Sequence, residues 1–376
     1  MVPARFQSLG FQKERLLARM AEMGVQAVLL SSPENVFYTT GYPALPGAGN
    51  PILYALRNQF PFFSFIEQDG KITLLAWIGA LLGGVEFAVD HVEMFADKLG
   101  GALTLKNFFN AKNLVGKRLG IEASCPYDIC RMVEENAKPA GFVVIDALMD
   151  DLRAVKSKPE IEVMRKCTQI VEATVKELME IVKPGIRRPD LMREAKYRML
   201  KNGADGVSHV TISFGASNPE VEIDEELEKD SLVILDIGAS YQGYVSDIRR
   251  HVYTGAVPEG LTELHATMCD IVDAVSQACV PGKTARELYD LTVKLYEQNG
   301  LIPLIVNIGH TMGIQTEEIW LTNTIDLILQ PGMVVNLELY STYEPTNVYI
   351  GDEETYLITE RGAVQLTSLP RQIKCV

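Results

Sequence analysis

The pattern of apolar positions predicts an α/β domain over residues 1–156. Apolar residues recur at helical spacing from Leu16 to Met23 and lead into the strand-like run VQAVLL. The runs ITLLA and FVVIDA have the composition of further buried strands. Because helical and extended patterns alternate over this stretch, we expect a sheet covered by helices.

A long amphipathic segment opens a second domain, which we expect over residues 157–376. It follows the charged stretch KSKPEIE, and one of its faces stays apolar from Ile161 to Ile181. Pro184 and Gly185 then break the pattern, as is typical of a helix end.

The second domain contains an internal repeat. Pro-Gly pairs at 184–185 and 281–282 lie 97 residues apart, and each precedes a helical stretch that ends in Asn-Gly, at 202–203 and 299–300. Each copy is followed by two strand-like runs that carry acids where apolar residues are expected. The spacing predicts an α+β domain built from a duplicated helix and hairpin around a pseudo-twofold axis.

The acids in these strands are the candidate functional residues of the chain. The first pair of runs holds Asp236 and Asp247, and the second holds Glu338 and either Glu353 or Glu354. An ionised carboxylate in a strand core must be protonated, paired or bound to a cation. A single such acid could simply face solvent from an edge strand, but four of them in related hairpins favour a cation site.

Together with His310, these acids form an oxygen-rich set with one imidazole, which suits Mn²⁺, Fe²⁺, Co²⁺ or Zn²⁺. Two divalent ions balance four carboxylates better than one does, and such a pair can activate a shared water molecule. We therefore expect two divalent metal ions, Mn²⁺ or Co²⁺ ahead of Zn²⁺ or Fe²⁺.

Composition and charge limit the classes of partner that the protein is expected to bind. The chain has 35 Lys and Arg residues against 49 Asp and Glu residues, a net charge of −14 that disfavours nucleic acids and anionic membranes. The longest apolar run, from Leu74 to Val85, is shorter than the roughly 18 residues of a membrane helix. The first fifteen residues lack the pattern of a secretory signal. We expect a cytoplasmic protein with no nucleic-acid partner and no membrane partner.

Several motifs resemble those of the pita-bread metallopeptidase and creatinase family, which includes prolidases and Xaa-Pro aminopeptidases. They run along the whole chain: NVFYTTGY (35–42), KSKPEIEVMRK, VILDIGASYQGYVSDIRR, GHTMGI and PGMVVNLE. The resemblance implies a creatinase-like N-terminal domain (1–156) followed by a pita-bread catalytic domain (157–376).

The resemblance also implies a set of site residues. The metal ligands would be Asp236, Asp247, His310, Glu338 and Glu353, where counting back from the sequence LIT favours Glu353 over Glu354. Glu338 would also receive a proton and pass it to the leaving nitrogen. The family further implies a dipeptide or other small-molecule substrate, and a homodimer in which one N-terminal domain borders the partner's site.

The sequence departs from the family at two histidines that contact substrate in its peptidases. One of these positions is Glu317 here, and the loop before Asp236 holds no histidine. His209 could turn into the site instead, although a core or surface imidazole is the alternative. The main hypothesis is a dinuclear metal-dependent hydrolase of an amide-type C–N bond, similar to prolidase or Xaa-Pro aminopeptidase. The alternatives are an enzyme for a non-peptide amide, amidine or cyclic nitrogen compound, and a binding module without catalysis.

Overall fold

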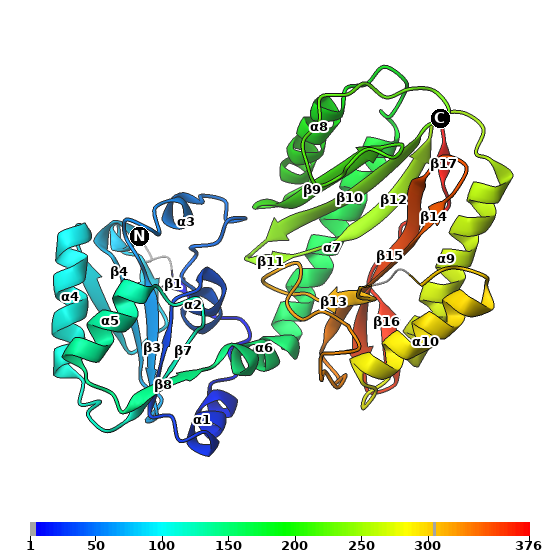
Figure 1. Ribbon diagram of the computed structural model, residues 1–376. Coiled ribbons are helices and arrows are strands. Elements are labelled where there is room, and N and C mark those ends of the chain that lie inside the picture. Colours follow the sequence, from blue (N-terminus) through cyan, green and yellow to red (C-terminus); the bar gives the residue numbers. More distant parts are fainter. Residues whose placement is uncertain (1–4, 304–305) are drawn as a thin grey trace. The chain divides into compact units, whose positions relative to one another are not determined.

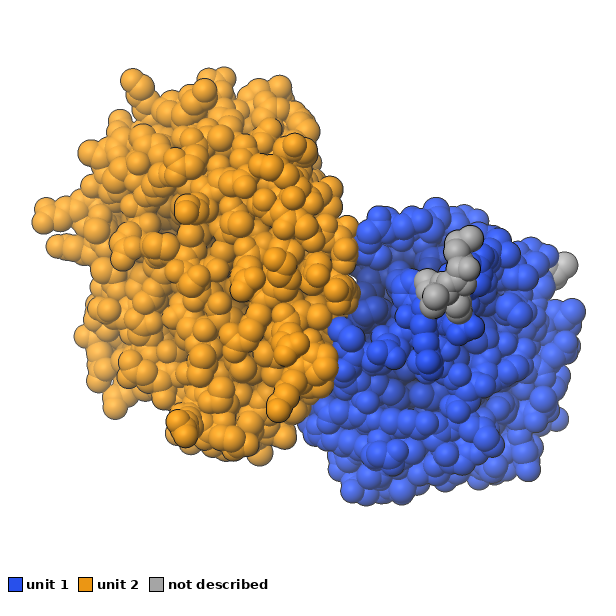
Figure 2. Space-filling view, turned by 180° about the vertical axis from the view of Figure 1, so that it is seen from behind, with its two compact units in different colours: residues 1–153 blue, residues 154–376 orange. Residues whose placement is uncertain are grey.

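The computed structural model describes residues 5–303 and 306–376, and it contains two compact units. The first unit ends at Arg153 and the second begins at Ala154 (Figure 2). Each unit has its own sheet, helices and apolar core (Figure 1). No helix in the described ranges is long and apolar enough to cross a membrane.

The first unit is built on a six-stranded mixed sheet with the strand order β6-β4-β3-β2-β7-β8. Its strands are β2 (Ala27–Leu30), β3 (Phe63–Glu67), β4 (Ile72–Trp77), β6 (His91–Phe95), β7 (Arg118–Ile121) and β8 (Gly141–Val144). A separate parallel pair consists of β1 (Arg5–Phe6) and β5 (Glu86–Phe87). The helices are α1 (Lys13–Glu22), α2 (Pro33–Thr40), α3 (Ile52–Ala55), the 3₁₀ helix η1 (Ile78–Leu81), α4 (Lys98–Ala111), α5 (Tyr127–Asn136) and α6 (Asp146–Ala154).

The strand expected at FVVIDA is shorter and less buried than the sequence suggested. Strand β8 stops at Val144 and pairs only on one side, with β7, so that it forms an edge of the sheet. Asp146 then opens α6, where a negative charge is favourable at the N-terminus of the helix, and its carboxylate accepts a hydrogen bond from the Ala123 backbone N–H.

The second unit contains two sheets. The first has the order β11-β10-β12-β17, with β9 also paired to β10, and the second has the order β13-β14-β15-β16. The first sheet consists of β9 (Gly206–Phe214), β10 (Leu232–Tyr241), β11 (Tyr244–Val245), β12 (Ile248–Tyr253) and β17 (Lys374–Cys375). The second consists of β13 (Gly309–Thr311), β14 (Val334–Tyr343), β15 (Val348–Thr359) and β16 (Gly362–Gln365). The helices are α7 (Lys158–Met179), α8 (Arg188–Lys201), α9 (Glu259–Ala278) and α10 (Ala285–Gln298).

The structure shows the duplication that the spacing predicts. Helices α8 and α10 both have 14 residues, and each follows a Pro-Gly turn. Gly185 and Gly282 share a φ of +88°, a conformation that side-chain-bearing residues rarely adopt. Gly185 N donates to Leu227 O at 2.8 Å, and Gly282 N donates to Leu329 O at 2.9 Å. The two copies therefore repeat the same backbone hydrogen bond between the Pro-Gly turn and the segment that leads into the hairpin.

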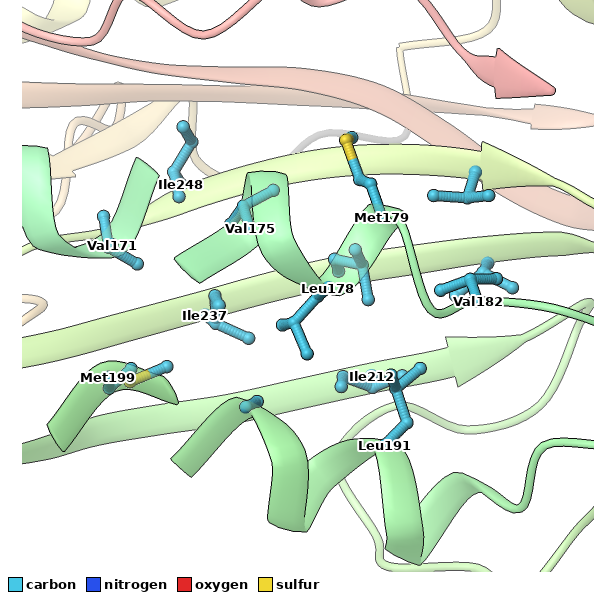
Figure 3. Packing of buried hydrophobic residues seen from close by; sticks show 14 of the residues in the cluster. Val171, Val175, Leu178, Met179, Val182, Leu191, Met199, Ile212, Ile237 and Ile248 are labelled. Carbon is cyan, nitrogen blue, oxygen red and sulfur yellow. The ribbon is translucent and has the colours of Figure 1, made fainter. Parts of the chain in front are cut away.

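Each hairpin buries one face under helices and leaves the other face for the site. In the first copy, Leu235 and Ile237 belong to an apolar cluster with residues of α7 and α8, and Figure 3 labels Ile237 in this cluster. In the second copy, Leu337 and Leu339 pack into the core formed with α9 and α10. Because side chains alternate along a strand, Asp236 and Glu338 project from the opposite faces. Strand β12 contacts β15, which brings the two hairpins together.

Candidate metal centre

The five residues expected to bind metal converge in the second unit. Asp236 lies in β10, Glu338 in β14, Glu353 in β15 and His310 in β13, while Asp247 lies between β11 and β12. Donor atoms of Asp247, His310 and Glu353 all lie within 4.8 Å of one another, and the same is true of Asp236, Glu338 and Glu353. We call this set of five side chains the acid cluster.

Strand register explains part of this convergence. Glu338 and Glu353 are directly opposite each other in the antiparallel β14–β15 pair, which places their side chains on the same face. Asp236 is opposite Arg249 in the β10–β12 pair. Each hairpin therefore places one pair of facing side chains at the site, Asp236 with Arg249 and Glu338 with Glu353.

Glu353 is the most strongly buried carboxylate of the cluster. Glu353 is 1% exposed, and its Oε1 accepts a hydrogen bond from the Asn336 side chain, whereas its Oε2 has no hydrogen-bond partner among the described residues. Burial, with the added negative charges of Asp247 and Asp236, raises the pKa of Glu353 well above its usual value. A buried carboxylate oxygen without a donor carries a large desolvation penalty, which a bound cation would offset.

His310 presents one ring nitrogen to this part of the cluster. Its Nδ1 lies 3.3 Å from Thr311 O, and its Nε2 lies 3.7 Å from Asp247 Oδ2. A proton on Nδ1, donated to the carbonyl, leaves Nε2 free to act as a ligand. Gly309 permits this position, because its φ is +130° and a Cβ there would lie 1.9 Å from Asn336 O.

The sequence motifs do not single out Arg249, whose guanidinium lies among the carboxylates of the acid cluster. Its Nη2 lies 2.5 Å from both Asp236 Oδ2 and Glu338 Oε1, and its Nε lies 3.1 Å from Asp236 Oδ2. Burial alone would raise the pKa of Asp236, but Arg249 and then His209 hold that pKa well below its usual value. The available signal was the two-residue period of a strand, which puts Arg249 on the same face as Asp247.

His209 reaches the acid cluster from β9. Its Nε2 lies 3.2 Å from Asp236 Oδ1 and 3.1 Å from Asp247 Oδ1. Burial would lower the pKa of His209, but Asp247 and Asp236 raise that pKa well above its usual value. Gly238 leaves room for the ring, since a Cβ there would lie 2.5 Å from the imidazole.

Glu317 follows β13 and is exposed. Partial burial, together with Glu338 and Asp247, raises its pKa despite the opposing effect of His310. The adjacent Glu318 has a different environment, because its buried side chain pairs with Lys156 at 2.8 Å. Of these two neighbouring acids, Glu317 is therefore the one exposed to solvent near the cluster.

Glu354 and Arg250 lie outside the acid cluster. Arg250 Nη2 donates to Glu354 Oε1 at 2.7 Å, and both side chains are almost completely buried. The sequence left open whether Arg250 orients the clustered acids, and the structure assigns that position to Arg249 instead.

A pocket of about 650 Å³ opens beside the acid cluster. Asp236, Arg249 and Glu338 contribute to its wall, which also contains the polar and aromatic residues Ser213, Ser217, Tyr340 and Tyr349. Its size is within the range of small-molecule sites. The arrangement combines buried acids, one imidazole and a pocket at their edge.

Comparison with known proteins identifies both parts of the chain. Residues 12–155 match the Creatinase/Prolidase N-terminal domain, and residues 162–360 match Metallopeptidase family M24. The Xaa-Pro dipeptidase of Pyrococcus furiosus is 27% identical over 369 residues, which cover 96% of this chain and 98% of that protein.

Solved structures agree with this assignment. The prolidase from Pyrococcus horikoshii has a TM-score of 0.81 and 26% identity, covering 96% of this chain and 98% of its own. A prolidase from Thermococcus sibiricus, with 21% identity, shows the same fold at a TM-score of 0.84 over 97% of this chain and 98% of its own. These matches confirm the expected fold and the class of metal-dependent hydrolase. Because the M24 match spans more than half of the sequence, the chain belongs to metallopeptidase family M24.

Proposed function

We propose that this protein hydrolyses the amide-type C–N bond of Xaa-Pro dipeptides with the help of divalent metal ions. The observation that carries the proposal is the buried acid cluster, in which the Oε2 atom of Glu353 has no hydrogen-bond partner in the part of the chain that the structure describes. The similarity to Xaa-Pro dipeptidases over nearly the full length of the chain supports the choice of substrate.

The residues present fit a divalent ion. Asp247, His310 and Glu353 would hold it with two carboxylates and one imidazole, a donor set that suits Mn²⁺ or Co²⁺, with Zn²⁺ and Fe²⁺ as alternatives. A bound divalent ion supplies a Lewis acid and lowers the pKa of a water molecule. The two-ion arrangement expected from the sequence stays a prediction, because Arg249 already contacts Asp236 and Glu338.

Two side chains are suited to handle protons and developing charge. Glu338 lies in the pocket wall and is one-fifth exposed, so that we assign it the transfer of a proton from the attacking water to the leaving nitrogen. His209 is held by Asp236 and Asp247, and its raised pKa favours the charged ring. A charged imidazole can donate a hydrogen bond to the oxygen of the scissile carbonyl.

Glu317 would contribute to substrate selection. Its carboxylate near the acid cluster favours a cationic or neutral polar group over an anionic one. In a dipeptide, the free amino group is the cation that this charge would attract. We therefore expect Glu317 to affect the KM of a dipeptide more than its kcat.

An assay after metal exchange tests the proposal. The protein is purified without chelator, analysed for metal, stripped, and reloaded separately with Mn²⁺, Co²⁺, Zn²⁺ or Fe²⁺. It is then given Xaa-Pro dipeptides, dipeptides without proline, and small non-peptide amides and amidines. Glu338→Gln serves as the impaired variant, and Glu344→Gln, which changes another pocket acid outside the acid cluster, serves as its matched control.

Each result separates one hypothesis from the others. Metal-dependent release of proline, reduced at least about 100-fold in Glu338→Gln, supports the proposal. Metal binding with turnover of non-peptide compounds alone would support the second substrate class. A protein that binds no metal and turns over none of these compounds would instead be a binding module.

The family resemblance also leads us to propose a homodimer. Size-exclusion chromatography with light scattering tests this, because it compares the mass in solution with the 41.6 kDa chain. A monomer at assay concentration would contradict it.

A further inference from the structure

We infer that the guanidinium of Arg249 takes the place of one of the two divalent ions, so that the acid cluster holds a single metal ion at Asp247, His310 and Glu353. This inference rests on the proposed function, because it specifies how many ions the proposed hydrolase uses. It depends on the position of one arginine that the sequence motifs did not single out.

The guanidinium lies among the oxygen atoms that a second ion would need. Asp236, Glu338 and Glu353 form one of the two metal-ligand groups of the acid cluster, with donor atoms within 4.8 Å of one another. Arg249 contacts all three of them. Its Nη2 is 2.5 Å from Asp236 and from Glu338, and its Nε is 3.7 Å from Glu353 Oε2. Since carboxylate oxygens bind such ions at about 2.0–2.2 Å, the ion and the guanidinium would compete for the same space.

The backbone holds Arg249 in this position. It is directly opposite Asp236 in the β10–β12 register, and its side chain is only 14% exposed. The planar guanidinium carries five N–H donors and stays charged at any physiological pH, which suits it to bridge two carboxylates. It therefore provides a permanent cation, unlike a metal ion that exchanges with solution.

The other half of the cluster differs in this respect. Of the described residues, no arginine or lysine hydrogen-bonds to a side-chain oxygen of Asp247 or Glu353, although the ring of His209 lies 3.1 Å from Asp247 Oδ1. Within residues 5–303 and 306–376, Glu353 Oε2 has no hydrogen-bond partner, and His310 offers its Nε2 to the same region. Among the described residues, the carboxylate oxygens without an arginine or lysine hydrogen bond are therefore on the His310 side of the cluster, whereas Asp236 and Glu338 pair with Arg249.

Charge balance points in the same direction. With the imidazole rings left out of the count, four ionised carboxylates carry four negative charges, and Arg249 with one divalent ion contributes three positive charges. Two divalent ions beside Arg249 would instead exceed the carboxylates by one positive charge. They would also place a second ion against a guanidinium at contact distance, where like charges repel each other.

Metal stoichiometry tests the inference without an activity assay. Stripped full-length protein is titrated with Mn²⁺ by calorimetry, and the Mn²⁺ content is measured after equilibrium dialysis. We expect one Mn²⁺ per chain for the wild type and two for Arg249→Ala. Arg249→Ala with Asp236→Asn should return to one, because the group that Arg249 occupies in the wild type would then lack one of its three carboxylates.

Electron paramagnetic resonance gives a second readout. Two Mn²⁺ ions about 3.5–4 Å apart couple magnetically, whereas one isolated ion does not. Coupling is expected in Arg249→Ala and absent from the wild type. Arg249→Lys keeps the positive charge and should still bind one ion, which guards against a poorly folded alanine variant. Arg371→Ala, which removes an arginine paired with Asp352 and Asp273 outside the acid cluster, should leave the stoichiometry at one.

Contrary results are distinguishable from one another. Two Mn²⁺ per wild-type chain would overturn this inference but leave the proposed hydrolase intact. One Mn²⁺ in folded Arg249→Ala would also overturn it, because removal of the guanidinium would then have opened no second site. A wild type that binds none of Mn²⁺, Co²⁺, Zn²⁺ and Fe²⁺ would overturn the proposed function and this inference together.

Discussion

Strand β15 carries three consecutive acids, and its two faces surround them with different charges. Asp352 and Glu354 point to the face that also buries Tyr356, where Arg371 and Arg250 pair with them at 2.8 and 2.7 Å. Glu353 points to the acid cluster, where four carboxylates share one arginine. Burial alone therefore does not distinguish a structural acid from a site acid, whereas the local balance of charge does.

The pKa values illustrate the same contrast. Burial raises the pKa of Glu354, and Arg250 opposes this rise. Burial also raises the pKa of Glu353, but there Asp247 and Asp236 reinforce it. Both shifts have the same direction, so only their causes separate the two residues. Changes that remove one charge on either face should then have different consequences.

The largest effect is expected for Glu354→Gln. This change leaves the guanidinium of Arg250, which is 1% exposed, without its carboxylate partner. Breaking a buried ion pair on one side costs about 3–5 kcal/mol of the free energy of unfolding. Urea denaturation of the metal-free protein measures it. A loss below about 1 kcal/mol would show that Arg250 finds enough compensation in the carbonyl oxygens that it also contacts.

Glu353→Gln should behave in the opposite way. The metal-free variant should be as stable as the wild type or more stable, because the change removes one of several repelling carboxylates. Its stabilisation by metal should disappear, whereas the wild type gains about 2.7 kcal/mol when free metal is 100 times its Kd. Denaturation with and without Mn²⁺ gives both values. Equal stabilisation of variant and wild type would exclude Glu353 as a ligand.

Low pH should lower the free energy of unfolding through two buried histidines, which lie near the face of β15 that carries Asp352 and Glu354. The rings of His251 and His265 lie 5.0 Å apart, and His265 is close to Asp352. Burial lowers the pKa of both, and for His251 the charge of His265 adds to the effect. Below about pH 6.5 the unfolded chain therefore binds protons that the folded chain does not, so that stability falls as pH falls.

Each histidine contributes at most about 1.4 kcal/mol per pH unit to this slope. The slope of unfolding free energy between about pH 6.5 and 5 should be smaller in His265→Gln than in the wild type. His91→Gln changes an exposed histidine of β6 and serves as the matched control. A slope that is identical in all three proteins would contradict the prediction.

The smallest effect is expected for Asp273→Asn. This residue pairs with Arg371 at 2.7 Å, but its side chain is 42% exposed. Solvent-exposed ion pairs contribute about 0.2–1 kcal/mol, and salt screens them. The difference from the wild type should shrink further at about 1 M salt. A loss as large as that of Glu354→Gln would show that exposure does not govern the energetics of this face.

Local sequence pattern determined much of the architecture. The 3.6-residue and two-residue periods, and the two Pro-Gly turns at equal spacing, specify helix α7, the paired helices α8 and α10, and the acid-bearing hairpins. The cost of burying Asp236 or Glu338 without a cation is a local property of any strand, and it can therefore be predicted before the fold is known. The resemblance of the sequence motifs then indicated the family to which the chain belongs.

Only the tertiary structure decided which charges meet. The contact of Arg249 with Glu338 joins residues 89 positions apart, and it depends on how the β10–β12 and β14–β15 hairpins approach each other. The pairing of β9 with β10 in the first sheet placed His209 beside Asp236 and Asp247. Such long-range pairings follow from sheet register and packing, which local periodicity does not contain.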